Sequence, residues 1–106
     1  MKYATLRSYA LSLPEVTEEP HHQLNSFRVR GRIFATVPPE QEHVHLFVSE
    51  QQREVALALY PEFIEKLFWG GKVVGVRVAL AGAKAAPVKE LLRRAWEYKR
   101  SRPRWA

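Results

Sequence analysis

The chain has 106 residues, of which 46% are hydrophobic and 26% are charged, and its formal net charge is +6. This length and composition predict one globular domain spanning residues 1–106, and they exclude a two-domain or largely disordered chain. The absence of cysteine excludes disulfides and thiolate metal sites, and the absence of aspartate excludes phosphoryl-transfer sites that hold Mg²⁺ through Asp.

The first part of the chain predicts a helix and then a loop. Leu6 and Ala10 recur at helical spacing and Pro14 ends the pattern, so we expect a helix over residues 2–12. Residues 14–24 combine prolines, acids and two histidines without any periodicity, which predicts a connecting loop.

Residues 26–37 predict a β-hairpin. Ile33, Ala35 and Val37 are apolar at every second position, as in a strand with one buried face. Gly31 lies where a tight turn needs a residue that tolerates a positive φ.

This hairpin is expected to have one apolar and one basic face. With a three-residue loop at residues 29–31, Phe27 pairs with Ile33, and Arg28 stands opposite Arg32. The predicted basic face consists of Ser26, Arg28, Arg32, Phe34 and Thr36, and Arg30 projects from the tip.

The next segments predict a third strand and a second helix. Residues 43–48 alternate between apolar and other side chains after a loop with two adjacent prolines, which indicates a strand. Ser49 and Gln52 have the spacing of a capping box, so we expect a helix over residues 50–60 that resumes over residues 62–68.

The last third of the chain predicts a fourth strand and a long helix. Residues 69–72 contain two glycines and predict a turn, after which residues 73–80 alternate as a strand. Pro87 fits the first turn of the last helix, and Pro103 ends that helix. Its apolar stripe consists of Val88, Leu91, Leu92, Ala95 and Trp96.

This order of elements predicts an α+β fold. The strands of the first half follow one another too closely for the crossover helices of a parallel sheet. We therefore expect an antiparallel sheet of about four or five strands with the helices packed on one face.

Positive charge is concentrated in the second half of the chain. Residues 1–50 hold five Lys or Arg against six Glu, whereas residues 51–106 hold twelve against five. This balance favours polyanionic partners, nucleic acid first, although basic charge also serves solubility.

Three segments resemble the YjbR/MmcQ family in their order and spacing. They are LPEVTEE at residues 13–19, FRVRGRIFA at residues 27–35 and ELLRRAW at residues 90–96, so the resemblance covers nearly the whole chain. The resemblance implies a small CyaY-like (frataxin-like) α+β fold with a double-wing arrangement. It also implies DNA binding, and it gives no established enzymatic activity to carry over to this chain.

We therefore expect a non-enzymatic DNA-binding module that contacts mainly phosphates. Basic side chains neutralise phosphates, and an exposed aromatic ring can stack on an unpaired base. The hairpin at residues 26–37 and the Lys72–Arg77 strand would act as wings. The last helix would add positive charge. The predicted contact residues are Arg28, Arg30, Arg32, Phe34, Lys72, Arg77, Arg93, Arg94, Lys99 and Arg100, and Arg102 and Arg104 extend this basic stretch.

Three other interpretations stay open. The arginines can be solvated side chains without a partner. A protein or small ligand can instead bind a face that bears Phe34, Phe47 and Trp69, and such binding would depend little on salt. An enzyme with His or Glu as general acid or base would need two such groups in one cleft.

The histidines do not predict a metal site. His43 and His45 share one strand face, and His21 and His22 follow an acidic segment, but nothing brings three or four ligands together. The first helix also lacks the acidic ridge with which frataxins bind iron. We therefore expect neither a metal nor a cofactor.

No stretch approaches the ~20 apolar residues of a membrane-spanning helix, and the first residues lack the pattern of a secretory signal. We expect a cytoplasmic protein without membrane contacts. The oligomeric state does not follow from the sequence.

Overall fold

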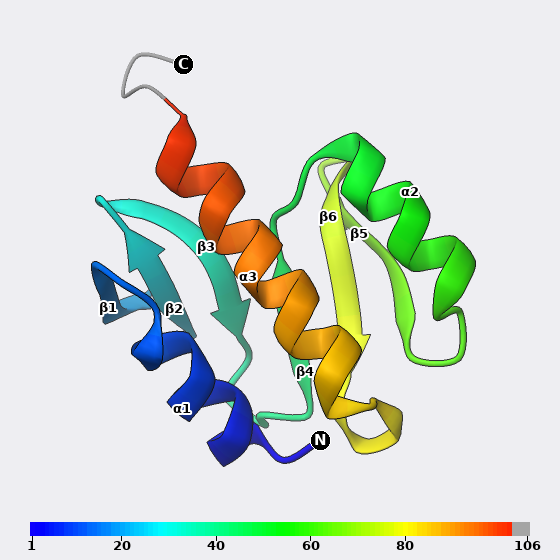
Figure 1. Ribbon diagram of the computed structural model, residues 1–106, viewed down its shortest axis with the longest axis horizontal. Helices are drawn as coiled ribbons and strands as arrows, with labels where there is room; N and C mark the ends of the chain where they lie inside the picture. The colour runs from blue at the N-terminus through cyan, green and yellow to red at the C-terminus, as the bar shows by residue number, and fades with distance from the viewer. Residues whose placement is uncertain (103–106) are drawn as a thin grey trace.

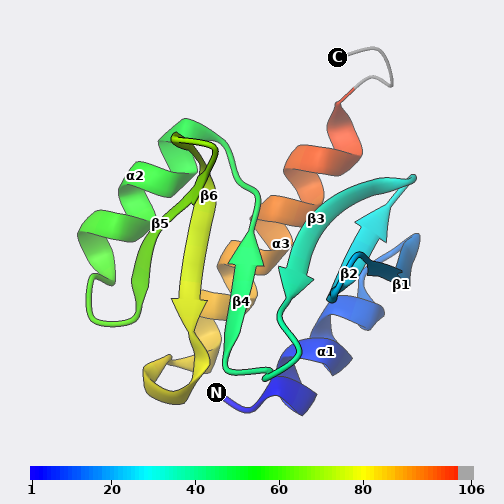
Figure 2. The ribbon, with the colours of Figure 1, turned by 180° about the vertical axis from the view of Figure 1, so that it is seen from behind.

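Three helices pack on one face of a six-stranded antiparallel sheet in the computed structural model, which describes residues 1–102 (Figure 1). The elements are α1 (Tyr3–Ser12), β1 (Val16–His21), β2 (Leu24–Val29), β3 (Arg32–Val37), β4 (His43–Leu46), α2 (Glu50–Leu59), β5 (Ile64–Trp69), β6 (Lys72–Ala79), the 3₁₀ turn η1 (Leu80–Gly82) and α3 (Ala85–Ser101). The strand order is β1-β2-β3-β4-β6-β5, and every neighbouring pair is antiparallel. Figure 2 shows the other face of the sheet in front of the helices. The α+β class is confirmed, with six strands instead of four or five.

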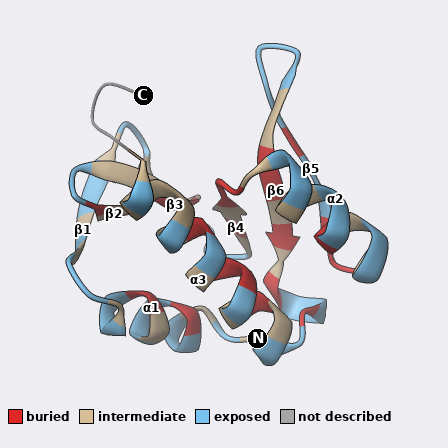
Figure 3. Cartoon of the chain, turned by 45° about the horizontal axis from the view of Figure 1, so that its top comes forward, coloured by how far each residue is buried: buried red, intermediate tan, exposed pale blue. Residues whose placement is uncertain are grey.

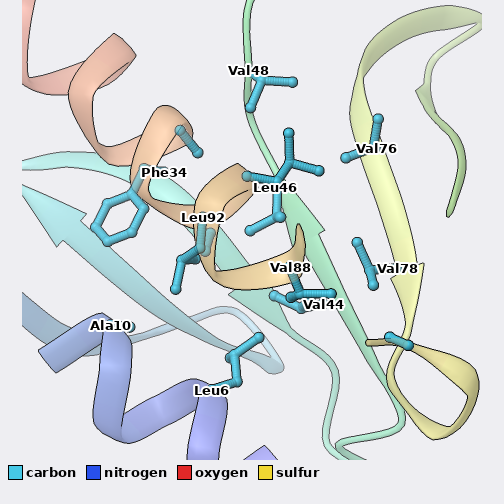
Figure 4. Packing of buried hydrophobic residues seen from close by; sticks show 14 of the residues in the cluster. Leu6, Ala10, Phe34, Val44, Leu46, Val48, Val76, Val78, Val88 and Leu92 are labelled. Carbon is cyan, nitrogen blue, oxygen red and sulfur yellow. The ribbon is translucent and has the colours of Figure 1, made fainter. Parts of the chain in front are cut away.

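Helix α3 crosses the middle of the sheet and supplies one wall of the core. Val88, Leu91, Leu92 and Ala95 are buried, as their spacing predicted. Figure 3 shows these buried positions on the side of α3 that faces the strands. In Figure 4, Val88 and Leu92 lie against the apolar side chains that β4 and β6 direct toward the helices.

Strand β1 replaces the loop predicted for residues 14–24. It pairs only with β2, so it is an edge strand, and none of its six residues is buried. A strand exposed on both faces has no hydrophobic alternation, and Pro20 is tolerated there because an edge strand has spare backbone donors. The prediction of a loop was therefore wrong for residues 16–21, because it relied on the absence of hydrophobic periodicity.

Strand β5 replaces the helix predicted for residues 62–68. Ile64 and Leu67 are buried and three positions apart, a spacing that fits a helix. The register of β5 against β6 shifts between Leu67 and Phe68, so the strict alternation of a strand is lost there. This irregularity gave the strand a helical pattern.

The β2–β3 hairpin has a different register from the predicted one. Phe27 pairs with Ala35 and Arg28 with Ile33, so β3 carries one extra residue between these two pairs, Phe34. Such a bulge turns the following side chains relative to the sheet. Phe34 is 0% exposed and belongs to the core, instead of lying on an exposed basic face.

Two hairpin tips and one helix end lie at the same end of the molecule, with the end of α3 between the two tips (Figures 1 and 2). Figures 1 and 2 both show the β2–β3 turn, the β5–β6 turn and the C-terminal end of α3 at the top. We call this region the hairpin end and define it by residues 30–32, 69–72 and 99–102. The buried ring of Phe47 packs against Trp69 and lies near Lys99. No helix among residues 1–102 is long and apolar enough to cross a membrane.

Candidate nucleic-acid interface

The two tips of the hairpin end are tight turns of the same kind. Arg30 and Gly31 have φ values of 53° and 78°, and Gly70 and Gly71 have values of 56° and 82°. Two successive positive φ values at the centre of a two-residue turn are those of type I′, whose twist matches the flanking strands. Backbone geometry therefore holds both tips in a defined orientation.

A single carboxylate serves two arginines beside the β2–β3 tip. Nε of Arg30 lies 2.8 Å from a carboxylate oxygen of Glu15, and Nε of Arg100 lies 4.0 Å from the same oxygen. The hydrogen bond from Arg30, followed by the charge of Arg100, lowers the pKa of the Glu15 carboxyl. When all three side chains are ionised, the two arginines and the glutamate together have a net charge of +1.

Arg32 ties the hairpin to the end of α3. Its Nη1 donates to the carbonyl oxygen of Lys99 at 3.2 Å and also to that of Arg102. A cation is favourable here because the last carbonyls of a helix carry partial negative charge. The second nitrogen, Nη2, is buried and has no hydrogen-bond partner within residues 1–102.

Lys99 lies in a cluster of like charges. Burial, together with the nearby charges of Arg102 and Arg32, lowers the pKa of the Lys99 ammonium. Within residues 1–102, no carboxylate comes within the 4.0 Å of an ion pair to any of these three side chains. We call Arg32, Lys99 and Arg102 the cation cluster, and it has an excess of positive charge that a bound anion would offset.

An aromatic pair connects this cluster to the second tip. The ring centroids of Trp69 and Phe47 are 5.1 Å apart, and Nζ of Lys99 lies 6.0 Å from the Phe47 centroid. Trp69 pairs with Lys72 across the β5–β6 turn, so both side chains project from the same face of the hairpin. Each ring of the pair therefore has a lysine nearby, Lys72 for Trp69 and Lys99 for Phe47.

Phe34 does not contribute to this surface, because the bulge in β3 buries it. The exposed rings are those of Phe68 and Trp69, which are 58% and 46% exposed. Phe68 was assigned to a helical segment and was therefore missed as an exposed ring. The two glycines that follow Trp69 were the available signal, since residues beside a hairpin turn are commonly in water.

Four predicted contact residues lie outside the hairpin end and have acidic neighbours. Arg28 Nε is 3.9 Å from a Glu19 oxygen, and Arg77 Nη1 is 3.6 Å from a Glu65 oxygen. On α3, Arg93 contacts Glu90 and Glu97, and Arg94 contacts Glu90. The fold thus gathers Arg30, Arg32, Lys72, Lys99 and Arg100 from the prediction, joined by Arg102. Arg104 lies outside the described residues.

The structure does not form the alternative ligand-binding face that was expected to bear Phe34, Phe47 and Trp69. Phe34 and Phe47 are both buried, at 0% and 7% exposure, so only Trp69 of the three is accessible. An apolar groove of about 200 Å³ lies elsewhere, between α2 and α3. Its lining includes Val55 and Leu59, which are large exposed apolar side chains.

The histidines of β4 lie on the sheet face away from the helices. Nδ1 of His45 is 3.1 Å from the Thr36 hydroxyl oxygen. Burial, then the charges of Arg77 and His43, lowers the pKa of His45. Among residues 1–102, no three His or Glu side chains are grouped so that they could hold a metal ion.

Comparisons with known proteins agree with this fold. A family model described as YjbR matches residues 11–98. Among solved structures, protein DR2400 of Deinococcus radiodurans, which carries a DUF419 domain, matches with a TM-score of 0.76 and 26% sequence identity. The match covers 90% of this chain and 75% of that chain. No curated protein matches the sequence.

Proposed function

We propose that this chain, which belongs to the YjbR family, is a non-enzymatic DNA-binding module that holds the phosphate backbone at its hairpin end. The observation that carries the proposal is the cation cluster, in which Lys99 lies close to the charges of Arg32 and Arg102. Arg77 on the outer sheet face and Arg93 and Arg94 on α3 form ion pairs with glutamates. The three members of the cation cluster have no such partner within the described residues, and they lie next to one another at the hairpin end.

Phosphate groups would relieve a cost that the free protein carries. Like charges and burial disfavour the charged form of Lys99, and Arg32 has a buried donor without a partner in residues 1–102. A phosphate oxygen can accept a hydrogen bond from Lys99, and its negative charge reduces the repulsion among the three cations. Binding therefore gains from groups that are already desolvated and held in position.

The position of the charges fits contacts with a backbone that runs across the hairpin end. Arg30 and Arg100 lie beside one tip, and Lys72 lies at the other, with the cation cluster between them. Contacts of this type are independent of base sequence. We expect binding to all sequences with similar affinity.

Salt dependence tests this proposal directly. If about four phosphates are neutralised, the slope of log K against log salt is about −3.6 for duplex DNA and about −2.8 for a single strand. The measurement is the binding of labelled DNA, in both forms, over a series of salt concentrations. A slope near zero, or no binding at low salt, would exclude the proposal.

Two double variants with equal charge separate the hairpin end from general basicity. Lys72→Gln with Lys99→Gln removes two charges at the hairpin end. Lys2→Gln with Lys84→Gln removes two charges from the other end, because Lys84 precedes α3 and Lys2 precedes α1. We expect the first pair to reduce affinity about tenfold or more and the second pair to change it less than threefold, as screening weakens distant charges. Equal losses would assign the binding to net charge alone.

The groove between α2 and α3 supports a second candidate function, the binding of an apolar ligand or peptide. Val55 and Leu59 are exposed beside the buried Leu91, so part of this surface is apolar and open. Such binding would change little with salt. If Leu59→Ser loses the binding of an apolar ligand or peptide while its affinity for DNA is unchanged, that result would favour this candidate.

A further inference from the structure

The β5–β6 tip carries a large aromatic surface that the fold does not bury. Phe68 and Trp69 are consecutive at the end of β5, and both remain about half exposed. Exposed aromatic rings of this size contribute little to stability, because they remove little area from water. Their position on a protruding hairpin, visible in Figure 3, makes them accessible to a large partner.

Trp69 is held in place more firmly than an ordinary tip residue. One part of its side chain packs on the buried ring of Phe47, with an interplanar angle of 59°. The type I′ turn formed by Gly70 and Gly71 fixes the backbone that follows it. The exposed part of the indole is therefore presented with few rotamers available, so a partner that stacks on it loses little entropy.

Cations lie near this aromatic pair. Lys72 is directly opposite Trp69 in the strand register, and Nζ of Lys99 lies 6.0 Å from the centroid of Phe47, the ring on which Trp69 packs. The pKa of Lys99 also responds to the charges of Arg102 and Arg32, so the positive surface continues toward α3. An aromatic ring flanked by cations is the arrangement with which proteins bind nucleic-acid strands, because bases stack while the phosphates on either side are neutralised.

A single strand fits this arrangement better than a duplex. Bases in a duplex are already stacked on their neighbours, so a ring enters only when a base step is opened, at a cost of a few kcal/mol per step. An unpaired base offers its aromatic face without that cost. A protein partner would use the rings but would leave the flanking lysines without a matching charge unless it were acidic.

We infer that the hairpin end binds single-stranded DNA, with an unpaired base stacked on Trp69 and the adjacent phosphates contacting Lys72 and Lys99. This inference rests on the proposed function, DNA binding, and narrows the ligand from DNA in general to single-stranded DNA. Stacking gives little discrimination among bases, since every base has an aromatic face. The site therefore selects for unpaired DNA and not for a sequence.

The test compares a labelled oligo(dT) strand with a hairpin duplex of similar charge at one low salt concentration. We expect the strand to bind at least tenfold more tightly. Trp69→Ala should weaken strand binding about tenfold, within the range found for single stacking residues, and leave duplex binding within twofold. Trp69→Phe should restore most of the lost affinity because it keeps a ring.

Leu11→Ala is the matched control, because Leu11 is also large, apolar and exposed but lies on α1. It should leave both affinities unchanged, and thermal unfolding should show that all variants are folded. Equal affinity for strand and duplex, with no effect of Trp69→Ala, would overturn the inference while the proposed DNA binding stands. Failure to bind either form would overturn both.

Discussion

Nη1 of Arg32 lies 3.2 Å from the carbonyl oxygen of Lys99, and this contact joins the start of β3 to the last turn of α3. The same nitrogen also donates to the carbonyl oxygen of Arg102. Two segments that are far apart in sequence are thereby held together at the hairpin end. The arginine therefore acts as a helix-end partner, while its other terminal nitrogen, Nη2, is buried without a hydrogen-bond partner within residues 1–102.

Replacement of Arg32 by Ala should destabilise the protein by about 1–2 kcal/mol, because hydrogen bonds from a charged donor to helix carbonyls are lost. Urea unfolding followed by circular dichroism measures this change. Arg94→Ala is the control, since Arg94 is exposed on the surface of α3 and forms an ion pair with Glu90. An exposed ion pair of this kind is worth about 0.5 kcal/mol or less. Equal stability of the two variants would contradict the role of Arg32.

The bulge in β3 makes a specific prediction for Phe34. As a fully buried ring, it should cost about 3–5 kcal/mol when replaced by Ala, because the truncation leaves a cavity in the core. Phe68→Ala should cost less than about 1 kcal/mol, because that ring is mostly exposed. Equilibrium unfolding measures the free energy of unfolding of both variants. A small effect at Phe34 would restore the exposed basic face that the simple alternation predicted.

Gly75 marks a close approach of β6 to the end of β4. A Cβ at this position would lie 2.2 Å from the carbonyl oxygen of Leu46, a backbone atom that cannot rotate away. Gly75→Ala should therefore cost about 3 kcal/mol, at the upper end of overpacking effects. Gly82→Ala is the control, because nothing lies within 4 Å of a Cβ there. Thermal unfolding that shows the same stability for both variants would contradict this packing.

His45 should make stability depend on pH in the weakly acidic range. Burial, Arg77 and His43 lower its pKa below the usual 6.5, while Glu40 opposes this only in part. The unfolded chain thus takes up a proton more readily than the folded one, so the free energy of unfolding falls as the pH decreases from about 7 through 6.5 and below. Chemical unfolding between pH 7.5 and 5 measures the effect.

His45→Asn should remove this pH dependence, since an amide can keep the contact with the Thr36 hydroxyl but does not titrate. His22→Asn is the control, because His22 is exposed and its positive φ of 59° suits Asn. The lowered pKa values of Glu15 and Glu18 affect stability only below the usual 4.5, outside this window. An unchanged pH profile in His45→Asn would exclude His45 as its source.

The fold class could be predicted because the main helices and hairpins have strong local patterns. The stripe of α3 and the glycines of both type I′ turns are visible in the sequence, and the structure confirms them. Strands β1 and β5 could not be predicted in this way, because an edge position removes alternation from the first and a register shift disturbs it in the second. Periodicity reports on burial, and it fails where burial is irregular.

The candidate site could be predicted only in part. Lysine and arginine positions are visible in a sequence, but their acidic neighbours across the fold are not. Glu19 beside Arg28 and Glu15 beside Arg30 come from the segment predicted as a loop. The bulge that buries Phe34 has no signal of its own in the pattern of alternating residues. The grouping of Arg32, Lys99 and Arg102 at the hairpin end therefore needed the structure.

The most direct test of the proposed function is a map of where DNA contacts the protein. Amide chemical shifts of the ¹⁵N-labelled protein would be followed during titration with oligo(dT). DNA binding at the hairpin end predicts the largest changes at residues 30–32, 69–72 and 99–102, with saturation at a defined stoichiometry. Changes centred on Val55 and Leu59 in the α2–α3 groove, or no changes at all, would contradict it.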